Sequence, residues 1–292
     1  MGLTTGFEKI VRQSEPLAMH TWFQLGGPAE YFAEPETLDE LTALVRRCYE
    51  EGTDVRLLGQ GSNVLVRDEG VPGLVIHLSA SAFCGIHIEG RAVAAGGGAL
   101  LGRVVTTTVH RGLAGLETLV GIPGTVGGAL HGNAGSQGGN IGQWTFQATV
   151  LTAAGDIAER SGDDLAFNYR QSSLDELAIL EARCELEEDD PRQLAQRMQK
   201  HWIVKKASQP MGHQTAGCVF RNPRGVGAGK LIDDAGLKGT RIGGAVVSDR
   251  HANFIIAEPE STSQDVLRLI DLIRGQVRDR LGVELELELE VW

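Results

Sequence analysis

The sequence predicts a mixed α+β protein built from more than one domain. Its 292 residues exceed one average domain and fit two or three. Over the first 80 residues, strand-like and helix-like segments follow one another in the order strand, helix, strand, loop, strand, which is typical of a small α/β unit. Two glycine-rich stretches, at 59–63 and 121–139, interrupt the predicted elements, and a hydrophobic fraction of 42% is sufficient for buried cores.

The N-terminal part contains one helix whose two ends can be predicted from capping residues. Thr37 followed by Glu40 forms a capping box, and Gly52 is a stop signal. Between them, apolar residues recur with a helical period, at positions 38, 41, 44, 45 and 48. The other elements expected here are a short helix at 1–13, a strand-like run at 16–27, and strands at 54–58, 64–66 and 74–78.

The middle of the chain predicts a second group of strands and two helices. A helix at 100–111 is stopped by Gly112, and Pro191 is well placed to begin a helix that runs to about Lys206. Two strands joined by Ala-Ala-Gly-Asp predict a hairpin. The strands expected in this part are 92–95, 147–152, 157–160 and 177–186.

The C-terminal part predicts a third unit, which ends in an alternating segment. A long helix at 262–281 carries apolar residues at helical spacing, and GVELELELEVW alternates as a half-buried strand does. The other elements expected here are a turn at 216–217, a helix near 229–235, and strands near 245–247 and 253–256.

The two glycine-rich stretches are the strongest indication of a ligand. GIPGTVGGALHGNAGSQGG, at 121–139, has eight glycines in nineteen residues, and a helix or strand interior would be destabilised by about 0.5–1 kcal/mol for each. Glycine backbone can lie flat against a ligand and direct N–H groups at it. Together with GQGSN at 59–63, this stretch predicts one large phosphate-bearing ligand held at two places. The alternative is that both stretches are ordinary tight turns.

The composition limits the kinds of binding partner and the cellular compartment that we expect. A net charge of −11 argues against nucleic acid or an anionic membrane as the main partner, but not against a phosphorylated small molecule. The four cysteines show no CxxC pairing and the eight histidines no HExxH spacing, so we expect neither a disulfide framework nor a metal. With no signal-peptide pattern and no apolar run of about 20 residues, a reducing cytoplasm is the expected location.

The familiar nucleotide and hydrolase signatures are incomplete. The loop at 59–63 lacks the third glycine of a Rossmann fingerprint, and the chain has neither a complete P-loop nor a GxSxG elbow. A nucleotide ligand is therefore expected to be held by another fold.

Six motifs, in order, resemble the UDP-N-acetylenolpyruvoylglucosamine reductases, flavoenzymes of peptidoglycan precursor synthesis. They are GQGSNVLVRD (59–68), GIPGTVGGALHGNAG (121–135), NYR (168–170), AGCVFRNP (216–223), AGKLIDDAGLKG (228–239) and GGAVVSDRHANFI (243–255), and the resemblance covers about residues 18–292. It implies an α+β chain with a two-part FAD-binding fold of the vanillyl-alcohol-oxidase (PCMH) type and a C-terminal α/β substrate domain. The implied division is 1–80, 81–203 and 204–292.

The resemblance implies non-covalent FAD, with NADPH as electron donor and a UDP-sugar as substrate. His131 is the one candidate tether in the flavin loops. We expect a monomer that binds neither nucleic acid nor membrane. The residues expected to contact FAD are Gly59, Gln60, Gly61, Ser62, Asn63, Gly121, Pro123, Gly124, Thr125, Gly127, Gly128 and Ala129.

The resemblance also implies three catalytic positions. Arg170 matches the arginine that contacts the substrate carboxylate, Glu290 matches the C-terminal glutamate, and Cys218 occupies the position of the proton donor, which is commonly serine. Glu288 lies two residues before Glu290 on the same strand face and remains an alternative to it. Each of the three positions has a plainer alternative: a surface arginine, a buried small residue and a solvent-facing glutamate.

Other matches concern the substrate and the subtype. Asn222 and Lys230 match positions near the bound substrate. No tyrosine follows Tyr169, so the chain resembles the second subtype, and Lys205, Lys206 or Arg221 would have to close over the substrate. Two other functions stay open: an oxidase that uses oxygen in place of NADPH, and a flavin or UDP-sugar binding protein without catalysis.

Overall fold

The chain forms two compact units that do not follow sequence order. The computed structural model describes residues 3–136, 138–223 and 225–292. The first unit contains 1–13, 30–59 and 72–204, and the second contains 14–29, 60–71 and 205–292. Two short N-terminal segments thus belong with the C-terminal part of the chain. The division into three domains stays a prediction.

A four-stranded sheet formed by the N-terminal part packs against one helix. The strand order is β1 (Val11–Pro16), β2 (Pro28–Ala33), β5 (Val71–His77) and β3 (Val55–Leu58), with β3 and β5 parallel. Helix α1 (Leu38–Glu51) begins with the predicted capping box of Thr37 and Glu40 and ends at Gly52, which is left-handed. Its buried side chains, including Leu41 and Leu44, share one core with Leu74 and Ile76 of β5. The predicted helix is confirmed.

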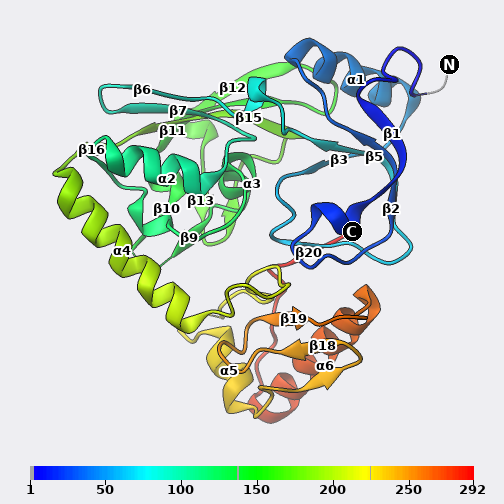
Figure 1. The fold of residues 1–292 in the computed structure, drawn as a ribbon, viewed down its shortest axis with the longest axis vertical. Helices are drawn as coiled ribbons and strands as arrows, with labels where there is room; N and C mark the ends of the chain where they lie inside the picture. Colours follow the sequence, from blue (N-terminus) through cyan, green and yellow to red (C-terminus); the bar gives the residue numbers. More distant parts are fainter. Residues whose placement is uncertain (1–2, 137, 224) are drawn as a thin grey trace. The chain divides into compact units, whose positions relative to one another are not determined.

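The first unit also contains a five-stranded antiparallel sheet (Figure 1). Its order is β12 (Ile157–Ser161), β11 (Thr145–Leu151), β15 (Ala178–Glu185), β7 (Ala92–Gly96) and β6 (Ile86–Glu89). Helices α2 (Leu101–His110) and α3 (Val126–His131) lie on the same side of this sheet and share its core. The predicted hairpin of β11 and β12 is confirmed by their antiparallel pairing.

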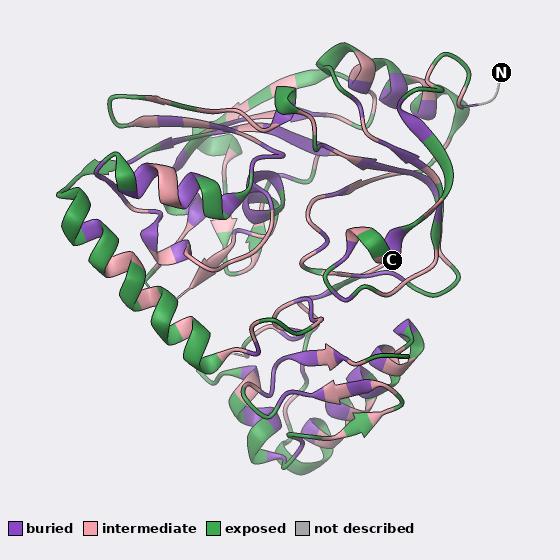
Figure 2. Cartoon of the chain, in the orientation of Figure 1, coloured by how far each residue is buried: buried purple, intermediate pink, exposed green. Residues whose placement is uncertain are grey.

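Short paired strands and 3-10 turns connect the longer elements of the first unit, and the predicted Arg170 lies in one of these connections. The paired two-residue strands are β9 (Gly135–Ser136) with β10 (Gly139–Asn140), β13 (Phe167–Asn168) with β14 (Gln171–Ser172), and β8 (Leu113–Ala114) with β16 (Glu187–Glu188). The 3-10 turns are η2 (Ser81–Phe83), η3 (Glu117–Leu119), η4 (Ile141–Gln143) and η5 (Gly162–Asp164). Helix α4 (Pro191–Ser208) follows and is largely exposed along its length, with Leu194 as its buried residue (Figure 2).

The second unit packs two helices on a small antiparallel sheet. Its elements are η1 (Leu17–His20), β4 (Val64–Leu65), α5 (Ala228–Asp234), β17 (Arg241–Ile242), β18 (Ala245–Val247), β19 (Ile255–Ala257), α6 (Ser263–Leu281) and β20 (Glu290–Val291). The sheet order is β17, β18, β19, and β20 pairs in parallel with β4. One core joins Ile232 of α5, Val247 of β18 and Ile273 of α6.

Two predictions near the N-terminus are wrong. Of the expected helix at 1–13, residues 1–2 lie outside the described part, residues 3–10 form turns around the left-handed Gly6, and Val11 begins β1. Of the expected strand at 16–27, Pro16 ends β1, and the rest is a 3-10 turn, η1, followed by irregular chain. There, Gly27 N donates a hydrogen bond to Arg67 O at 2.8 Å, so a pairing distant in sequence overrides local propensity.

The expected C-terminal strand is also mostly wrong, although its side-chain alternation is present. Leu285 and Leu289 are buried, as a half-buried strand requires, but the regular strand is only β20. The reason is a local irregularity: the N–H groups of Glu288 and Leu289 both donate to Val219 O, at 2.8 and 3.3 Å. Two donors on one carbonyl cannot continue a ladder of alternating pairs.

Candidate active site

The loop after β3 requires glycine for steric reasons. A Cβ on Gly59 would lie 2.9 Å from Thr125 Oγ1, and a Cβ on Gly61 would lie 2.2 Å from His20 O. Gly61 is also left-handed, with φ +61°. Since Gly59 and Thr125 belong to the first unit, the two predicted flavin loops are in contact there.

The end of this loop packs on the C-terminal segment within the second unit. Asn63 Nδ2 donates to Glu288 O at 3.0 Å, and Asn63 O accepts from Glu290 N at 3.0 Å. A Cβ on Gly217, one residue before Cys218, would lie 4.0 Å from Ser62 O. Gln60, Ser62 and Asn63 therefore belong to the same unit as the predicted Cys218 and Glu290.

The second glycine-rich loop is partly engaged inside the protein. Thr125 caps α3, where its Oγ1 accepts from Gly128 N at 3.3 Å, and Gly127 N donates to Gly97 O at 2.8 Å. A Cβ on Gly127 would lie 3.1 Å from Gly97 O, so glycine allows α3 to pack closely on the sheet. These two N–H groups donate within the protein and so stabilise the loop itself. A ligand could therefore interact with this backbone only by packing closely against it.

The remaining positions of this loop are partly accessible. Gly121 and Gly124 are left-handed, with φ of +76° and +117°, which an L side chain rarely adopts. Together with Pro123 they are half-buried, whereas Ala129 is buried.

Arg170 lies at the tip of a tight hairpin in the first unit. It follows Tyr169 in the two-residue turn between β13 and β14, and its φ of +56° is left-handed. Such a conformation is disfavoured for a residue with a Cβ and is often found at functional sites. Its Nη1 donates to Gly135 O at 2.9 Å, and its guanidinium carbon lies 5.4 Å from the centre of the Tyr169 ring.

Cys218 begins a segment that is held on two sides in the second unit. On one side, Asn253 O accepts from Val219 N at 2.9 Å, and the Asn253 amide pairs with both backbone groups of Phe220, at 3.0 and 2.8 Å. On the other side, Val219 O accepts from Glu288 N at 2.8 Å. Cys218 is half-buried, and the segment that bears Glu288 and Glu290 lies beside it.

The two glutamates at the C-terminus differ in exposure. Glu290 is exposed and Glu288 is half-buried, while Leu289 between them is buried. The choice between Glu288 and Glu290 stays a prediction.

Asn222 and Lys230 flank the start of α5. Asn222 Oδ1 accepts from Ala228 N at 2.8 Å, which fixes the first turn of the helix. Lys230 Nζ donates to Asp234 at 2.7 Å, and this pair raises the pKa of the lysine. The Lys230 side chain is 69% exposed, so a polyanionic ligand could reach its ammonium group.

Two buried asparagines were not singled out from the sequence. Asn133 is 3% exposed and Asn253 is 2% exposed, and each supports the segment that carries a predicted catalytic residue. Asn133 could have been noticed because it is the one residue larger than alanine in GNAG, within the glycine-rich stretch.

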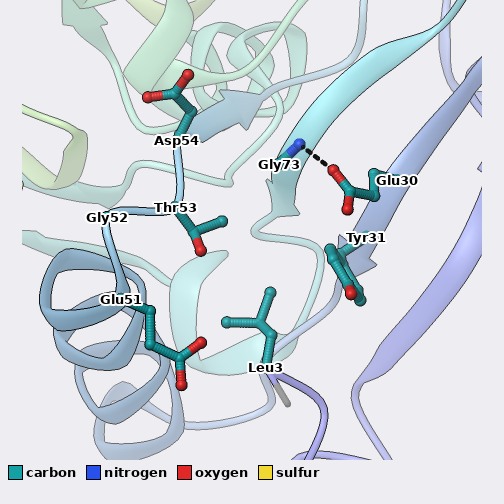
Figure 3. Close-up of a pocket in the computed structure, with 8 residues that line it drawn as sticks. All are labelled: Leu3, Glu30, Tyr31, Glu51, Gly52, Thr53, Asp54 and Gly73. Atoms are coloured by element: carbon teal, nitrogen blue, oxygen red, sulfur yellow. Dashed lines mark hydrogen bonds between the residues drawn. The ribbon is translucent and has the colours of Figure 1, made fainter. Parts of the chain in front are cut away.

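A surface pocket in the first unit contains none of the predicted site residues (Figure 3). It has a volume of about 430 Å³ and is lined by Leu3, Glu30, Tyr31, Glu51, Gly52, Thr53, Asp54 and Gly73. Glu30 Oε2 accepts from Gly73 N at 2.8 Å. With three carboxylates on its wall, this pocket is unsuited to a phosphorylated ligand.

Among the described residues, no group of three or more His, Cys, Asp or Glu side chains could hold a metal ion. Within the same part of the chain, no helix combines the length and apolar character needed to cross a bilayer.

Family models and relatives cover almost the whole chain. A model described as "FAD binding domain" matches residues 29–161, and one described as "UDP-N-acetylenolpyruvoylglucosamine reductase, C-terminal domain" matches residues 209–292. UDP-N-acetylenolpyruvoylglucosamine reductase 2 of Symbiobacterium thermophilum is 42% identical over 284 residues, which are 97% of this chain and 92% of that protein.

Solved structures agree with these matches. The crystal structure of the reductase of this name from Thermus caldophilus has a TM-score of 0.82 at 36% identity, over 97% of this chain and 98% of that one. A variant of berberine bridge enzyme has a TM-score of 0.50 at 19% identity, over 65% of this chain and 44% of that one, which shows a shared fold.

The FAD-binding domain, the glycine-rich loops and the shared fold define an FAD-dependent oxidoreductase, and the expected fold class is confirmed. The matches to reductases at 42% and 36% identity, each over 97% of this chain, narrow the assignment from this class to one family. The chain belongs to the UDP-N-acetylenolpyruvoylglucosamine reductase family.

Proposed function

We propose that this protein reduces UDP-N-acetylglucosamine enolpyruvate to UDP-N-acetylmuramate in peptidoglycan precursor synthesis, with FAD as cofactor and NADPH as electron donor. The observation that carries the proposal is 42% identity over 97% of the chain to a reductase of this family. The matched FAD-binding and C-terminal domains support it further, because they cover the two parts that such a reaction needs.

The two glycine-rich loops are the proposed contacts of FAD. Gly59 packs on the Thr125 side chain, because a Cβ at position 59 would lie 2.9 Å from Thr125 Oγ1, so the two loops meet closely at this point. We propose that Gly59–Asn63 and Gly121–Ala129 contribute backbone groups to cofactor binding, together with the side chains of Ser62, Asn63 and Thr125. We propose that FAD is bound without a covalent tether; His131, the one candidate in the flavin loops, has its Nδ1 3.0 Å from Leu174 O.

Arg170 has the role of stabilising negative charge on the substrate. When bound, FAD supplies the redox chemistry, by accepting a hydride from NADPH and passing one to the terminal vinyl carbon. The adjacent carbon and its carboxylate then share the negative charge of an enolate. The planar guanidinium of Arg170 can bind such a carboxylate through two parallel hydrogen bonds. Its bond to Gly135 O fixes the direction in which the guanidinium points.

Cys218 then has the role of giving a proton to the enolate carbon. Its thiol is the X–H group at the position where the family commonly has serine, and the segment around it is fixed by hydrogen bonds on both sides. Glu290, or Glu288, would assist in the protonated state, since a carboxylate beside the enolate would oppose the developing charge.

The sugar nucleotide would be recognised by residues near α5. The exposed ammonium of Lys230 suits a phosphate group, and Asn222 fixes the turn before the helix. The Nε of Arg221 is buried and has no hydrogen-bond partner among the described residues, so a bound oxygen would satisfy it. We propose a cytoplasmic location, because UDP-sugars and NADPH are cytoplasmic metabolites, and that the protein is a monomer stays a prediction.

One assay tests this function. The purified protein is expected to be yellow, to release flavin on acid precipitation, and to turn over NADPH continuously only when the enolpyruvyl sugar nucleotide is added. An oxidase would be reoxidised rapidly by air without the sugar, and a binding protein would not turn over. Colour that stays in the acid pellet would overturn non-covalent binding, and absence of sugar-dependent NADPH oxidation would overturn the function.

A further inference from the structure

Asn133 has an unusual environment for an asparagine close to a helix end. It follows α3 and the Gly132 cap, and its φ of +41° lies in the left-handed region. Asparagine tolerates this conformation better than most residues, but glycine tolerates it best. Its side chain is also buried, since the residue is only 3% exposed. Backbone conformation alone therefore does not account for asparagine here.

The Asn133 amide joins two segments that are separate in sequence. Its Nδ2 donates to Asn168 O at 2.7 Å, and its Oδ1 accepts from Gly142 N at 3.1 Å. A Cβ on Gly142 would lie 2.3 Å from the Phe167 ring, so the turn η4 and the β13–β14 hairpin are packed in direct contact. The amide thus holds together two backbones that already lie against each other.

The hairpin that Asn133 holds is the one that carries Arg170. Asn168 is the last residue of β13, two positions before Arg170, and Arg170 has a left-handed backbone. Two residues after Asn133, Gly135 O accepts from Arg170 Nη1 at 2.9 Å. The segment 133–135 therefore fixes both the base of the turn and the guanidinium at its tip.

We propose that Asn133 is a positioning residue for Arg170 in the reduction of the sugar nucleotide, an inference that rests on the proposed function. Its amide holds the strained turn so that the guanidinium meets the substrate carboxylate in a fixed direction. A displacement of about 1 Å in such a group can lower a rate by roughly 100-fold. The alternative is that Asn133 only ends α3, a task for which glycine would serve equally well.

Two variants separate these roles. Asn133→Gly keeps the left-handed backbone and removes the amide. Asn133→Asp keeps the size and the acceptor for Gly142 N, but replaces the donor that faces Asn168 O by an oxygen. We expect both to slow reoxidation of the NADPH-reduced enzyme by the enolpyruvyl sugar by roughly 10- to 100-fold. Reduction of FAD by NADPH should change by no more than a few-fold.

A matched control and a double variant exclude general damage. Thr145→Val removes a buried hydroxyl that donates to Ile141 O at 3.0 Å in the same η4 turn, without touching the hairpin. It should reoxidise with the sugar at close to the wild-type rate. In the Arg170→Lys background, Asn133→Gly should add little, because the group that it positions is already lost.

Hydrogen exchange of residues 167–172 gives a measurement that needs no substrate. It should be faster in Asn133→Gly than in wild type or Thr145→Val. If wild type fails to reduce the sugar, the proposed function fails. Hydrogen exchange still shows whether the Asn133 amide holds the hairpin. Normal reoxidation in a folded Asn133→Gly, or full additivity with Arg170→Lys, would overturn the positioning role. If the glycine variant does not fold, Asn133→Asp decides by the same measurements.

Discussion

In the first unit the Asn133 amide bridges two segments, whereas in the second unit the Asn253 amide pairs with a single residue. Asn133 bonds Gly142 N and Asn168 O, close to the exposed turn of Arg170. Asn253 bonds both the N–H and the carbonyl of Phe220, which is 1% exposed within the core of its unit. Both support a segment with a predicted catalytic residue, but Asn253 satisfies two buried groups of one core residue, whereas Asn133 satisfies one buried N–H and a part-buried carbonyl of the hairpin.

The two asparagines are therefore expected to affect different properties: Asn253 mainly the stability of the protein, and Asn133 mainly the geometry of the Arg170 turn. Without Asn253, two backbone groups of Phe220 would be left unsatisfied in a core, and each buried orphan costs about 1–3 kcal/mol. Without Asn133, the hairpin keeps its own strand pairing, one buried N–H, that of Gly142, loses its partner, and the Arg170 turn is held less closely. We therefore expect removal of Asn133 to lower mainly the rate and removal of Asn253, which leaves two orphans, to lower mainly the stability.

The largest effect is expected at Cys218. Cys218→Ala should leave FAD reduction by NADPH intact and slow sugar reduction by roughly 10²–10⁴-fold, the usual contribution of a general acid. Cys218→Ser should retain measurable activity, because serine is common at this position in the family. Stopped-flow measurement of the two half-reactions checks both. Near-normal sugar reduction by the alanine variant would show that the proton comes from another group. Arg170 would then be the one predicted catalytic residue left in the comparison of the two asparagines.

Arg170→Lys is expected to have the next largest effect. Lysine keeps the charge but cannot form the two parallel bonds to a carboxylate, so reoxidation by the sugar should fall by roughly 10²–10³-fold. Arg183→Lys is the matched control, since Arg183 forms a surface pair with Glu181 in the same unit. Equal damage to FAD reduction and to sugar reduction would contradict a role specific to the enolate.

Asn253→Ala tests the other half of the comparison. Unfolding in urea should show a loss on the order of 2–4 kcal/mol, because two buried backbone groups lose their partners. Gln214→Ala removes a side-chain bond to Gln24 near the surface of the same unit and should cost less than about 0.5 kcal/mol. If Asn253→Ala unfolded like wild type but lost sugar reduction, the two asparagines would be equivalent.

The contrast also shows what could be predicted from the sequence. The helices α1 and α6 followed from local signals, α1 from its capping box at Thr37 and its periodic apolar residues, and α6 from its periodic apolar residues. The irregular chain after Pro16 did not, because it is fixed by distant partners such as Arg67. The C-terminal alternation gave the correct buried leucines but not the doubled contact at Val219.

The same limit applies to the site. Arg170, Cys218 and the glycine-rich loops were singled out because their motifs are contiguous, although their roles stay predictions. Asn133 and Asn253 were missed because each acts on partners about 35 residues away, at separations of 35 for Asn168 and 33 for Phe220. A single sequence can mark Asn133 as unusual within GNAG, but it does not show which backbone groups either asparagine pairs with, and the hydrogen bonds of the buried amides do.

The smallest expected effect is a pH dependence confined to the second unit. His251 Nδ1 accepts from Asn253 N at 3.3 Å, and burial lowers the pKa of His251, with Lys238 acting in the same direction. The folded protein therefore resists a proton that the unfolded chain accepts below a pKa of about 6.5. This contribution is complete above that value and is lost as the pH falls toward the folded pKa. Asn133, in contrast, bonds an N–H and a carbonyl, which do not titrate in this range.

Unfolding in urea between about pH 7.5 and 5.5 measures this effect, since acidic side chains such as Glu34 and Glu258, whose pKa values are lowered, titrate at more acidic pH. His251→Gln should flatten the pH dependence of stability, because glutamine can accept the bond but cannot gain a proton. The control is His110→Gln, a change at an exposed histidine of the first unit, which should keep the wild-type slope. If stability changed with pH to the same extent in wild type and in His251→Gln, protonation would not weaken the hydrogen bonds that fix the Cys218 segment. In this respect they would resemble the bonds of Asn133 that fix the Arg170 turn.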